Sequence, residues 1–560
     1  MFEVLLITVF TVVSKAYWGT GGHIGIADGK GYYEYLPSYF IHKDLVRKNW
    51  DESDRQKFVR IDNNSGIYVK ADGKTINKYP VGSAILEAPF FFGAYLLTER
   101  DDSPEDGYQE TFQTAVFSAA IFYLFLSLML LKLVLKDYQI SPFVIAVVQV
   151  LLAFSTSLSI YTNTEAGFSH IYSLVTVLFF LYTVRKYFGT PTRRGLIIAF
   201  GLLGLIMLLR QVNPIVVFFV PFLAGSSERL LSGVRFAFKA WKTLLVALFL
   251  FGIIVSFQFY MWYLQTGYWI VYSYQGESFN FAHPEFFNIL FSYRKGLFVY
   301  TPILLFGVLG TVFYLKSAKY EFFTWWLGFI GITYILSSWW SWYYGCSYGN
   351  RAFIEFYPLF FIPLGYFLEK AGKWKFLVIP ILSLTIPLNL IQTVQYNRYI
   401  LHWIDMDKEK YWKVFLHTEP VYQGLVWKEN KELSSFKKIR MYLLGDYEMK
   451  ENGGLVIDDF QVEDRNRPTV LSVSFSNQFD ANDESKIIID IKEEGQSEWL
   501  FWSETPLIYF HENKLNHYQK GRLDLEIPPL QCNGKLQLNF YVTVGGQTSP
   551  LKDIEVSVYQ

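Results

Sequence analysis

One acidic residue stands in a setting that suits proton transfer. Asp28 follows the glycine-rich residues 21–25 and precedes Tyr32, Tyr33 and Glu34. Glycines let the backbone approach a ligand closely, and aromatic rings stack on sugar rings or anchor at a membrane interface. A carboxylate in this setting can remove the proton from a hydroxyl group as a general base. The competing interpretation, to which composition gives equal weight, is an aspartate that caps a helix in a solvated turn.

Two further ionisable residues lie at the edge of an apolar segment. Glu165 and His170 flank the start of the apolar residues 169–187. Ionisable groups at a membrane edge are expensive, so they often mark a functional site. Both side chains could bind ligand hydroxyls or a phosphate, although His170 could equally cap the helix or pack at its start.

Four cations stand in short loops that are otherwise poor in lysine and arginine. They are Arg210, Arg294, Lys295 and Arg351. The planar guanidinium of arginine matches a phosphate group well. Snorkelling, or pairing with acids of neighbouring loops, is the alternative role. We expect at least two of the four to hold a phosphate.

Residues 338–351 combine several features of a ligand-binding loop. Trp342 and Tyr344 belong to an aromatic cluster that an interfacial belt alone would explain. A belt does not explain why Gly345, Gly349 and Arg351 occur in the same run. Cys346 has no evident base partner, which favours packing over a nucleophilic role.

The elements that must position these residues are membrane helices. The chain has 560 residues, of which 52% are hydrophobic and only 18% charged. A membrane-spanning helix needs about 20 mostly apolar residues, and by this criterion we expect about eleven spans. They cover residues 2–17, 112–135, 141–160, 169–187, 195–209, 212–224, 243–263, 298–315, 322–338, 353–368 and 376–391. The pattern predicts a polytopic α-helical membrane protein.

Loop charge predicts the orientation. Lysine and arginine gather in alternate loops, and the positive-inside rule places those loops and the N-terminus in the cytoplasm. The loop of residues 18–111 then lies outside, with residues 84–97 forming an interfacial helix because they are too short to span comfortably. The basic amphipathic residues 226–242 are expected to lie on the cytoplasmic membrane surface.

The C-terminal part has a different pattern. Residues 397–560 hold no long apolar run, and short stretches alternate with period two, as in 471–475, 523–527, 536–544 and 554–558. Such stretches between turn residues predict an all-β, sandwich-like domain. We therefore expect a transmembrane domain over residues 1–396 and an extracytoplasmic domain over residues 397–560.

The order of these features resembles the GT-C superfamily of membrane glycosyltransferases. A membrane anchor is followed by a large outer loop with an Asp-x-x-x-Tyr-Tyr element at residues 28–33, by many spans and by an outer tail. The chain looks similar to bacterial relatives of protein O-mannosyltransferases and of the lipid A aminoarabinose transferase. The resemblance covers the membrane part, and its motifs are short.

The resemblance implies an activity and a set of partners. Such enzymes transfer a sugar, with inversion, from a polyprenyl-phosphate-linked donor to a glycan, lipid or protein acceptor outside the cytoplasmic membrane. Asp28 would be the catalytic base, and the cations and aromatic residues above would bind donor and sugar. Many relatives have an Asp-Glu pair, whereas Gly29 follows Asp28 here. The second acid is therefore open between Glu34 and Glu165, and a divalent metal is possible without a clear ligand set.

Other classes are less well supported. O-antigen polymerases and ligases also use polyprenyl carriers, but their large outer loop comes late. A polytopic lipid or glycan transporter would usually show repeats and charges at the bilayer midplane. A tethered binding protein would need only one span. Zero formal net charge gives no support for a nucleic-acid partner, and the two cysteines fit no metal or disulfide spacing.

Overall fold

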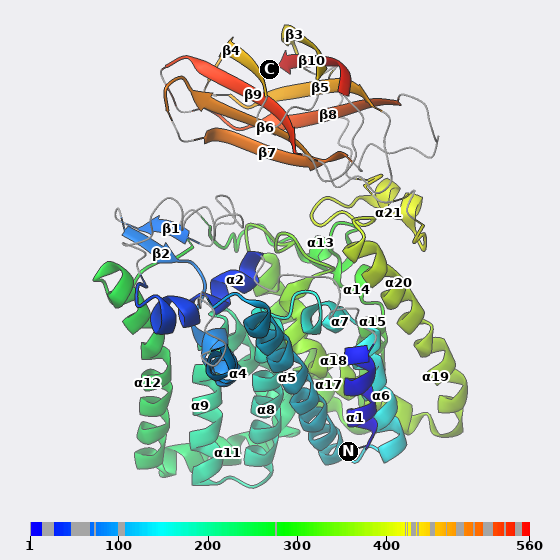
Figure 1. Cartoon of the computed structure of the whole chain (residues 1–560). Helices are drawn as coiled ribbons and strands as arrows, with labels where there is room; N and C mark the ends of the chain where they lie inside the picture. Colours follow the sequence, from blue (N-terminus) through cyan, green and yellow to red (C-terminus); the bar gives the residue numbers. More distant parts are fainter. Residues whose placement is uncertain are drawn as a thin grey trace. The chain divides into compact units, whose positions relative to one another are not determined.

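The computed structural model describes residues 2–13, 27–45, 68–71, 74–98, 107–274, 277–419, 422, 424–426, 433, 436–447, 454–465, 467–477, 486–496, 499–507, 519–530, 532, 534–543 and 551–560. The chain folds as two compact units, Met1–Thr393 and Val394–Gln560. The first is helical, and the second is built mainly of β-strands (Figure 1).

The helical unit contains one small hairpin among many helices. The hairpin pairs β1 (Tyr68–Ala71) with β2 (Lys74–Asn77). The α-helices are α1 (Phe2–Val13), α2 (Ala27–Tyr33), α4 (Gly82–Thr98), α5 (Glu110–Asp137), α6 (Pro142–Phe154), α7 (Leu158–Thr162), α8 (Ser169–Gly189), α9 (Arg193–Leu209), α10 (Val220–Ala224), α11 (Ser227–Lys239), α12 (Trp241–Thr266), α13 (Phe286–Phe291), α14 (Leu297–Tyr300), α15 (Ile303–Gly310), α16 (Tyr314–Ser317), α17 (Lys319–Ser337), α18 (Tyr357–Lys370), α19 (Lys375–Ser383) and α20 (Thr385–Asn397). Short 3₁₀ or π turns are η2 (Pro37–Ile41), η3 (Asn213–Phe219), η4 (Thr311–Phe313), η5 (Arg351–Phe356) and η6 (Gly372–Trp374).

Several of these helices suit a membrane. In the described part of the chain, five helical segments are long and apolar enough to cross a bilayer. The number is six if the bent segment from η3 to α11 is counted as a single membrane span. Shorter apolar helices include α1, α4 and α6. The chain is therefore a membrane protein, while the count of eleven spans stays a prediction. Expected span 141–160 is broken into α6 and α7, since residues 155–157 leave the helix.

Close backbone packing holds the bundle together. Helix α9 packs between α8 and α12. A Cβ on Gly307 of α15 would lie 2.5 Å from the carbonyl oxygen of Phe360 in α18, so only glycine permits this approach. Small residues allow such contacts where helices meet in a lipid environment that supplies little hydrophobic driving force.

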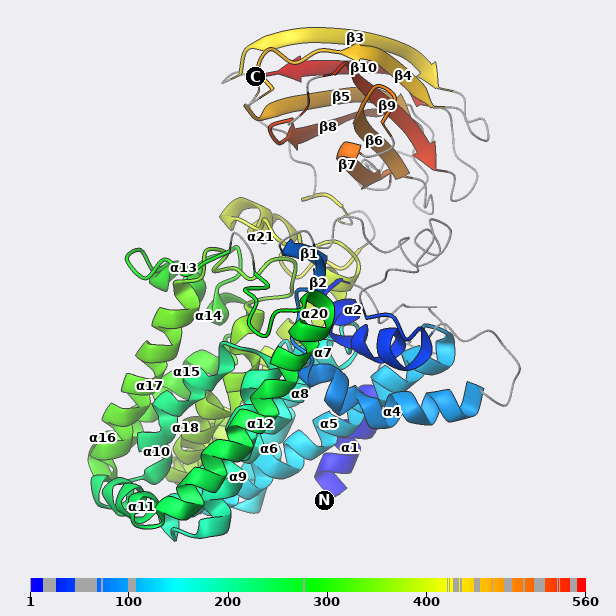
Figure 2. The same ribbon diagram turned by 90° about the vertical axis from the view of Figure 1, so that its left-hand side faces the viewer.

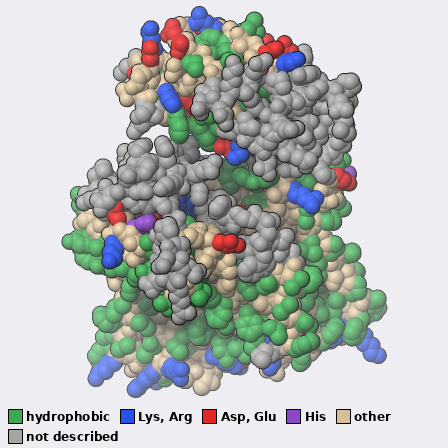
Figure 3. Space-filling view, in the orientation of Figure 1, with side chains coloured by type: hydrophobic (Ala, Val, Ile, Leu, Met, Phe, Trp, Pro, Cys, Tyr) green, Lys and Arg blue, Asp and Glu red, His purple; other side chains and the backbone are tan. Residues whose placement is uncertain are grey.

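Helix α4 runs in a different direction from the main bundle. Figures 1 and 2 show α4 lying across the direction of α9 and α12. A crosswise apolar helix is the geometry expected for the interfacial helix over residues 84–97, although its depth in a membrane stays a prediction. On the face seen in Figure 3, hydrophobic side chains cover the middle of this unit and lysine or arginine side chains gather along the end where α11 lies.

The second unit confirms the predicted β-structure. After α21 (Lys408–Val414) come β3 (Lys438–Tyr447), β4 (Leu455–Phe460), β5 (Thr469–Asn477), β6 (Lys486–Glu493), β7 (Trp499–Pro506), β8 (Gln519–Ile527), β9 (Leu536–Thr543) and β10 (Leu551–Tyr559). They form two four-stranded antiparallel sheets, in the orders β3-β10-β5-β8 and β4-β9-β6-β7. Alternate residues of both sheets, such as Leu471, Ile489 and Leu538, form a shared core. The stretch expected to end at residue 544 is described only as far as Thr543.

Candidate active site

Helix α2 presents Asp28 beside a tyrosine ring. Asp28 lies in the first turn of α2, and Tyr32 lies one turn later on the same side. The ring of Tyr79 packs on Tyr32, with 4.8 Å between the ring centroids. A Cβ on Gly31 would meet the Tyr79 ring at 2.2 Å, so glycine is required for this approach. The Tyr79 hydroxyl then reaches Asp28 and donates to Oδ1 at 2.6 Å.

The segment that carries Tyr79 is fixed from several sides. The Asn77 side chain donates to the Gly31 carbonyl oxygen at 2.8 Å, and the Tyr35 hydroxyl donates to the Tyr79 carbonyl oxygen at 2.6 Å. The backbone N–H of Val81 donates to Gln258 of α12 at 2.8 Å. A Cβ on Gly82 would clash with the backbone at Leu208, so α4 starts directly against the end of α9. Residues 77–82 therefore connect α2, α9 and α12 rigidly.

Asp28 forms an ion pair with Arg351. Oδ2 of Asp28 lies 2.6 Å from Nη1 of Arg351. Burial by itself would raise the pKa of Asp28, but the Arg351 charge and the Tyr79 hydrogen bond outweigh burial and hold the pKa below its ordinary value. Asp28 is therefore ionised at neutral pH, which a general base requires.

The loop of residues 338–350 brings Arg351 to this position. Gly345 and Gly349 have φ values of +68° and +60°, a conformation that side chains other than glycine rarely adopt. Arg351 begins η5, and its guanidinium lies 5.5 Å from the centre of the Phe168 ring. The two glycines thus allow the backbone of this loop to turn, which explains why they occur in the same run as the aromatic cluster.

A second ionic cluster lies one turn further along the chain. Glu355 is fully buried, and its Oε1 accepts from Arg210 Nη1 at 3.2 Å and from Asn213 Nδ2 at 3.3 Å. Nδ1 of His170 lies 3.1 Å from the same oxygen. Asn213 also donates to the Ser173 hydroxyl at 2.7 Å. The ring of Phe168 stacks on His170 and also borders Arg351, so the two clusters are neighbours.

The contacts of His170 depend on its tautomer. Nδ1 lies 2.9 Å from Arg210 Nη1 as well as 3.1 Å from Glu355 Oε1. If Nδ1 carries a proton it donates to Glu355, and if it does not it accepts from Arg210. His170 can therefore change its hydrogen-bond partner with its tautomer.

Sequence reasoning missed Glu355, Tyr79 and Asn213. The signal for Glu355 was present, because it is the lone carboxylate near the start of the apolar residues 353–368. An unpaired acid in such a run is costly and predicts a partner elsewhere in the bundle. Tyr79 lies in residues 78–82, which look similar to a Pro/Gly-containing element of the GT-C superfamily, but a plain turn explains the same residues and gave Tyr79 no role of its own.

Arg294 and Lys295 both contact the loop of residues 338–350. The Arg294 guanidinium stacks on the Tyr343 ring at 3.6 Å. Lys295 is buried, and its Nζ donates to the Ser347 carbonyl oxygen. Burial, together with the nearby charge of Arg351, lowers the pKa of Lys295 to about 7. Lys295 thus binds the backbone of this loop.

The remaining predicted residues are spread around this centre. The Tyr33 hydroxyl donates to the Gly107 carbonyl oxygen at 2.6 Å, and Glu34 accepts from Ser38 and Tyr108. Both residues thus hold α2 against residues 107 and 108, and their ligand-binding role stays a prediction.

The Tyr344 hydroxyl donates to the Leu336 carbonyl oxygen at 3.0 Å, and the Trp342 carbonyl oxygen accepts from Asn350 at 3.4 Å. Glu165 lies close enough to Lys295 and Arg351 to favour their charged forms electrostatically, although burial still lowers the pKa of Lys295.

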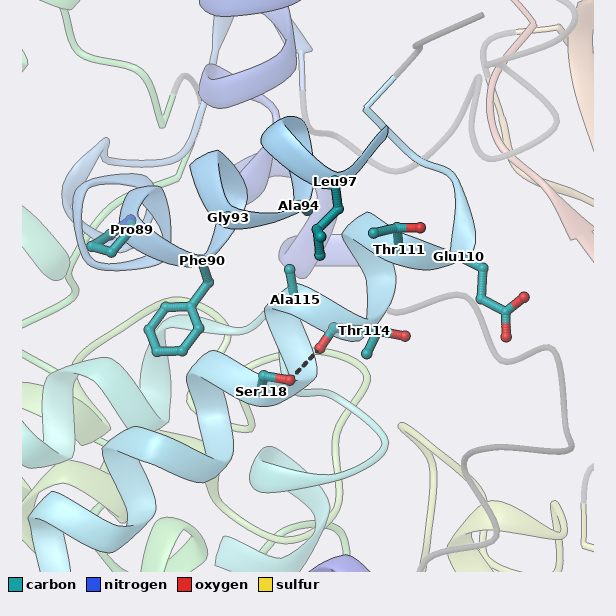
Figure 4. A pocket seen from close by; sticks show the side chains of 10 residues that line it. All are labelled: Pro89, Phe90, Gly93, Ala94, Leu97, Glu110, Thr111, Thr114, Ala115 and Ser118. Carbon is teal, nitrogen blue, oxygen red and sulfur yellow. Dashed lines mark hydrogen bonds between the residues drawn. The ribbon is translucent and has the colours of Figure 1, made fainter. Parts of the chain in front are cut away.

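One groove lies away from the ionic clusters. It runs between α4 and α5, has a volume of about 550 Å³, and is lined by residues such as Phe90, Leu97 and Thr114 (Figure 4). None of the predicted site residues lines it. Within the described residues, no group of three or more His, Cys, Asp or Glu side chains could hold a metal ion.

Comparisons with known proteins give a structural likeness. No family model matches the chain, and no curated protein matches it. Among solved structures, the chain is similar to the apo oligosaccharyltransferase of Archaeoglobus fulgidus, with 11% identity, a TM-score of 0.43, and coverage of 75% of this chain and 60% of that chain. It is also similar to the same organism's oligosaccharyltransferase AglB in complex with an inhibitory peptide and a dolichol-phosphate, with 10% identity, a TM-score of 0.40, and coverage of 75% and 59%.

These proteins are longer than this one, which spans 60% and 59% of their length. Archaeal oligosaccharyltransferase belongs to the GT-C superfamily, the superfamily that the sequence motifs resemble. With identities of 11% and 10% and TM-scores below 0.5, the likeness assigns no activity, substrate or partner to this chain.

Proposed function

We propose that this chain is an inverting glycosyltransferase that moves a sugar from a polyprenyl-phosphate-linked donor to an acceptor hydroxyl on the outer face of the cytoplasmic membrane. The observation that carries this proposal is the Asp28–Arg351 pair with its Tyr79 hydrogen bond. It joins an ionised carboxylate to a guanidinium at the end of the helical bundle where α2 lies. The loop-charge pattern supports an outer location for that end, with the N-terminus in the cytoplasm.

In the proposed reaction Asp28 takes the proton of the acceptor hydroxyl. The acceptor oxygen forms a bond to the anomeric carbon of the sugar as the bond from that carbon to the phosphate oxygen breaks on the opposite face. The phosphate leaves with the electrons of that bond, and nearby cations stabilise its charge.

The cations of the site suit two different tasks. Arginine has five N–H donors, so Arg351 can keep one edge on Asp28 and offer the other to the phosphate. Glu355 orients Arg210, and Arg294 is held on the Tyr343 ring beside the same loop. Lys295 supports the loop backbone through Ser347, and its part in phosphate binding, beside that of the three arginines, stays a prediction.

Replacing Asp28 by asparagine tests this proposal. Asp28→Asn keeps the size of the side chain but removes the base, so transfer should fall by about 10²- to 10⁴-fold. The matched control is Asp137→Asn, because Asp137 is also an aspartate paired with an arginine, Arg185, at 3.0 Å. The measurement is polyprenyl-phosphate release, by mass spectrometry, from synthetic polyprenyl-phosphate-linked monosaccharides and a panel of hydroxyl acceptors. Equal release by Asp28→Asn and wild type at matched protein levels would overturn the assignment.

A further inference from the structure

The sheet β4-β9-β6-β7 has an outward face that combines tryptophan rings with polar side chains. On β6, Ile487, Ile489 and Ile491 point into the core, so Asp490 and Lys492 belong to the opposite face. Asp490 is paired across the sheet with Trp502 of β7 and with Asn539 of β9. Lys492 is paired with Trp499 and with Gln537. Cross-strand partners share a face, so these six residues form two adjacent rows.

A β-bulge places both tryptophans on this face. Residues 499 and 502 are three apart, and in a regular strand they would point to opposite sides. The pairing of β6 with β7 shifts between Ile491 and Lys492, which leaves Leu500 as the additional residue of β7. The two rings consequently lie near one another, with centroids 6.3 Å apart and planes 31° apart. Trp499 remains 42% exposed.

The polar side chains beside the rings hold one another in place through hydrogen bonds and charge contacts. The Asn539 amide donates to Asp490 Oδ1 at 2.7 Å, and the Gln537 amide donates to Asp458 of β4 at 2.8 Å. The Lys492 ammonium lies 5.6 Å from the centre of the Trp499 ring and 4.0 Å from Asp490. Donors and acceptors are thus held in place next to flat apolar surfaces.

The chemistry of this face selects its ligand. Lys486 pairs with Glu504 and Lys492 approaches Asp490, so charges of both signs nearly cancel and give a polyanion no advantage. Sugars have one apolar ring face that stacks on tryptophan and hydroxyl groups that both donate and accept hydrogen bonds. The three strands β7, β6 and β9, spaced as in an ordinary sheet, extend over about 10 Å, enough for a short extended chain of sugar rings.

The other sheet offers no such surface. The outward residues of β5 are Ser472, Ser474 and Ser476, and their partners on β8 include Arg522 and Asp524. No tryptophan lies in any of its four strands. The aromatic and amide rows are therefore a feature of one face of the β-unit, not of the unit in general.

We propose that the outward face of β7, β6 and β9 binds an uncharged oligosaccharide chain through Trp499, Trp502, Lys492, Gln537 and Asn539. Asp490 is only 2% exposed and positions Asn539 from beneath this surface. This binding does not depend on the transferase activity proposed above. It would give the chain a second contact with a glycan, made by residues other than those of the Asp28 site.

Binding of neutral tetrasaccharides to the full-length protein in nanodiscs tests this inference. The probes are chitotetraose, mannotetraose and maltotetraose, and the measurement is isothermal titration calorimetry. We expect at least one probe to bind the wild type and Trp502→Ala to weaken that binding by about tenfold, because a ring stacking contact is lost. Trp502→Phe, which keeps a ring, should retain most of the affinity.

Controls separate this face from other sites and from loss of folding. Trp412→Ala removes another exposed tryptophan of the same unit, from α21, and should leave binding unchanged. Asp28→Asn should also bind the probe as the wild type does, whatever its effect on transfer. The inference is overturned if no probe binds the wild type, or if Trp502→Ala binds as tightly while its thermal unfolding matches that of the wild type.

Discussion

Among its described residues, the helical unit contains two aspartate–arginine pairs with the same local exposure but different surroundings. The side chains of Asp28 and Arg351 are 22% and 13% exposed, and those of Asp137 and Arg185 are 23% and 13% exposed. Both arginines also lie against an aromatic ring, Phe168 in one case and Tyr138 in the other. Solvent access and the ion pair itself therefore do not distinguish a candidate base from a structural link.

The second oxygen of each aspartate makes the difference. The second oxygen of Asp137 accepts from Lys186, a second cation whose side chain is 54% exposed. The charge of the Asp137 carboxylate is therefore fully neutralised at the ends of α5 and α8. The second oxygen of Asp28 instead accepts from the neutral hydroxyl of Tyr79. Buried charges also lie next to the Asp28 pair, since Glu355 and Arg210 pair there beside the ring of His170. An acid kept ionised among aromatic rings and positioned cations suits group transfer, whereas an acid between two cations fastens helix ends.

The largest effect is expected for the buried carboxylate next to the Asp28 pair. Glu355→Gln should lower the free energy of unfolding by about 3–5 kcal/mol, because it leaves the Arg210 charge buried without its partner. Asp137→Asn should cost less than about 1 kcal/mol, since its ion pairs are partly exposed. Chemical unfolding in detergent micelles measures both changes. Equal, small losses would show that the Glu355 cluster is no more important to the fold than the surface pair.

A somewhat smaller effect is expected for exchanging the arginine of each pair. Arg351→Lys should reduce transfer on the order of 100-fold, because a lysine ammonium cannot bridge Asp28 and a phosphate with two edges. Arg185→Lys should keep nearly wild-type transfer, because its site needs only a positive charge. Rates of polyprenyl-phosphate release from the two purified variants test the comparison directly. Similar rates in both would remove the functional distinction between the pairs.

The smallest effect is expected for the hydrogen bond that only Asp28 has. Tyr79→Phe should slow transfer by about tenfold at neutral pH. The pKa of Asp28 is held below its ordinary value, so the ionised base is present at higher pH and is lost as pH falls through that pKa. Without the Tyr79 donor the pKa rises, and the acid limb of the pH–rate profile should move to higher pH. A slower variant with an unmoved acid limb would contradict this role of the hydroxyl, because phenylalanine keeps the ring that packs on Tyr32.

Sequence patterns predicted the kinds of element and several of the chemical groups. The alternation at residues 471–475 and 523–527 predicted strands β5 and β8, and the structure confirms both. Asp28 and Arg351 were both selected from the sequence, each for its own setting. That they bind one another was not predictable, because their pairing depends on how α2 and η5 pack although the two residues lie far apart in the chain. Glu355 was overlooked in an apolar run, where hydropathy averages hide a single charge.

The amino-acid sequence by itself determined the membrane helices, the β-rich tail and the inventory of acids, cations and aromatic rings. These follow from periodicity and composition, which act locally along the chain. Tertiary structure alone decided which acid meets which cation, and it separated Asp28 from Asp137 through the partner of one oxygen atom. It also brought Trp499 and Trp502 to one face through a bulge that no alternation pattern reveals. Such contacts join residues from different elements, and their geometry is set by packing in three dimensions.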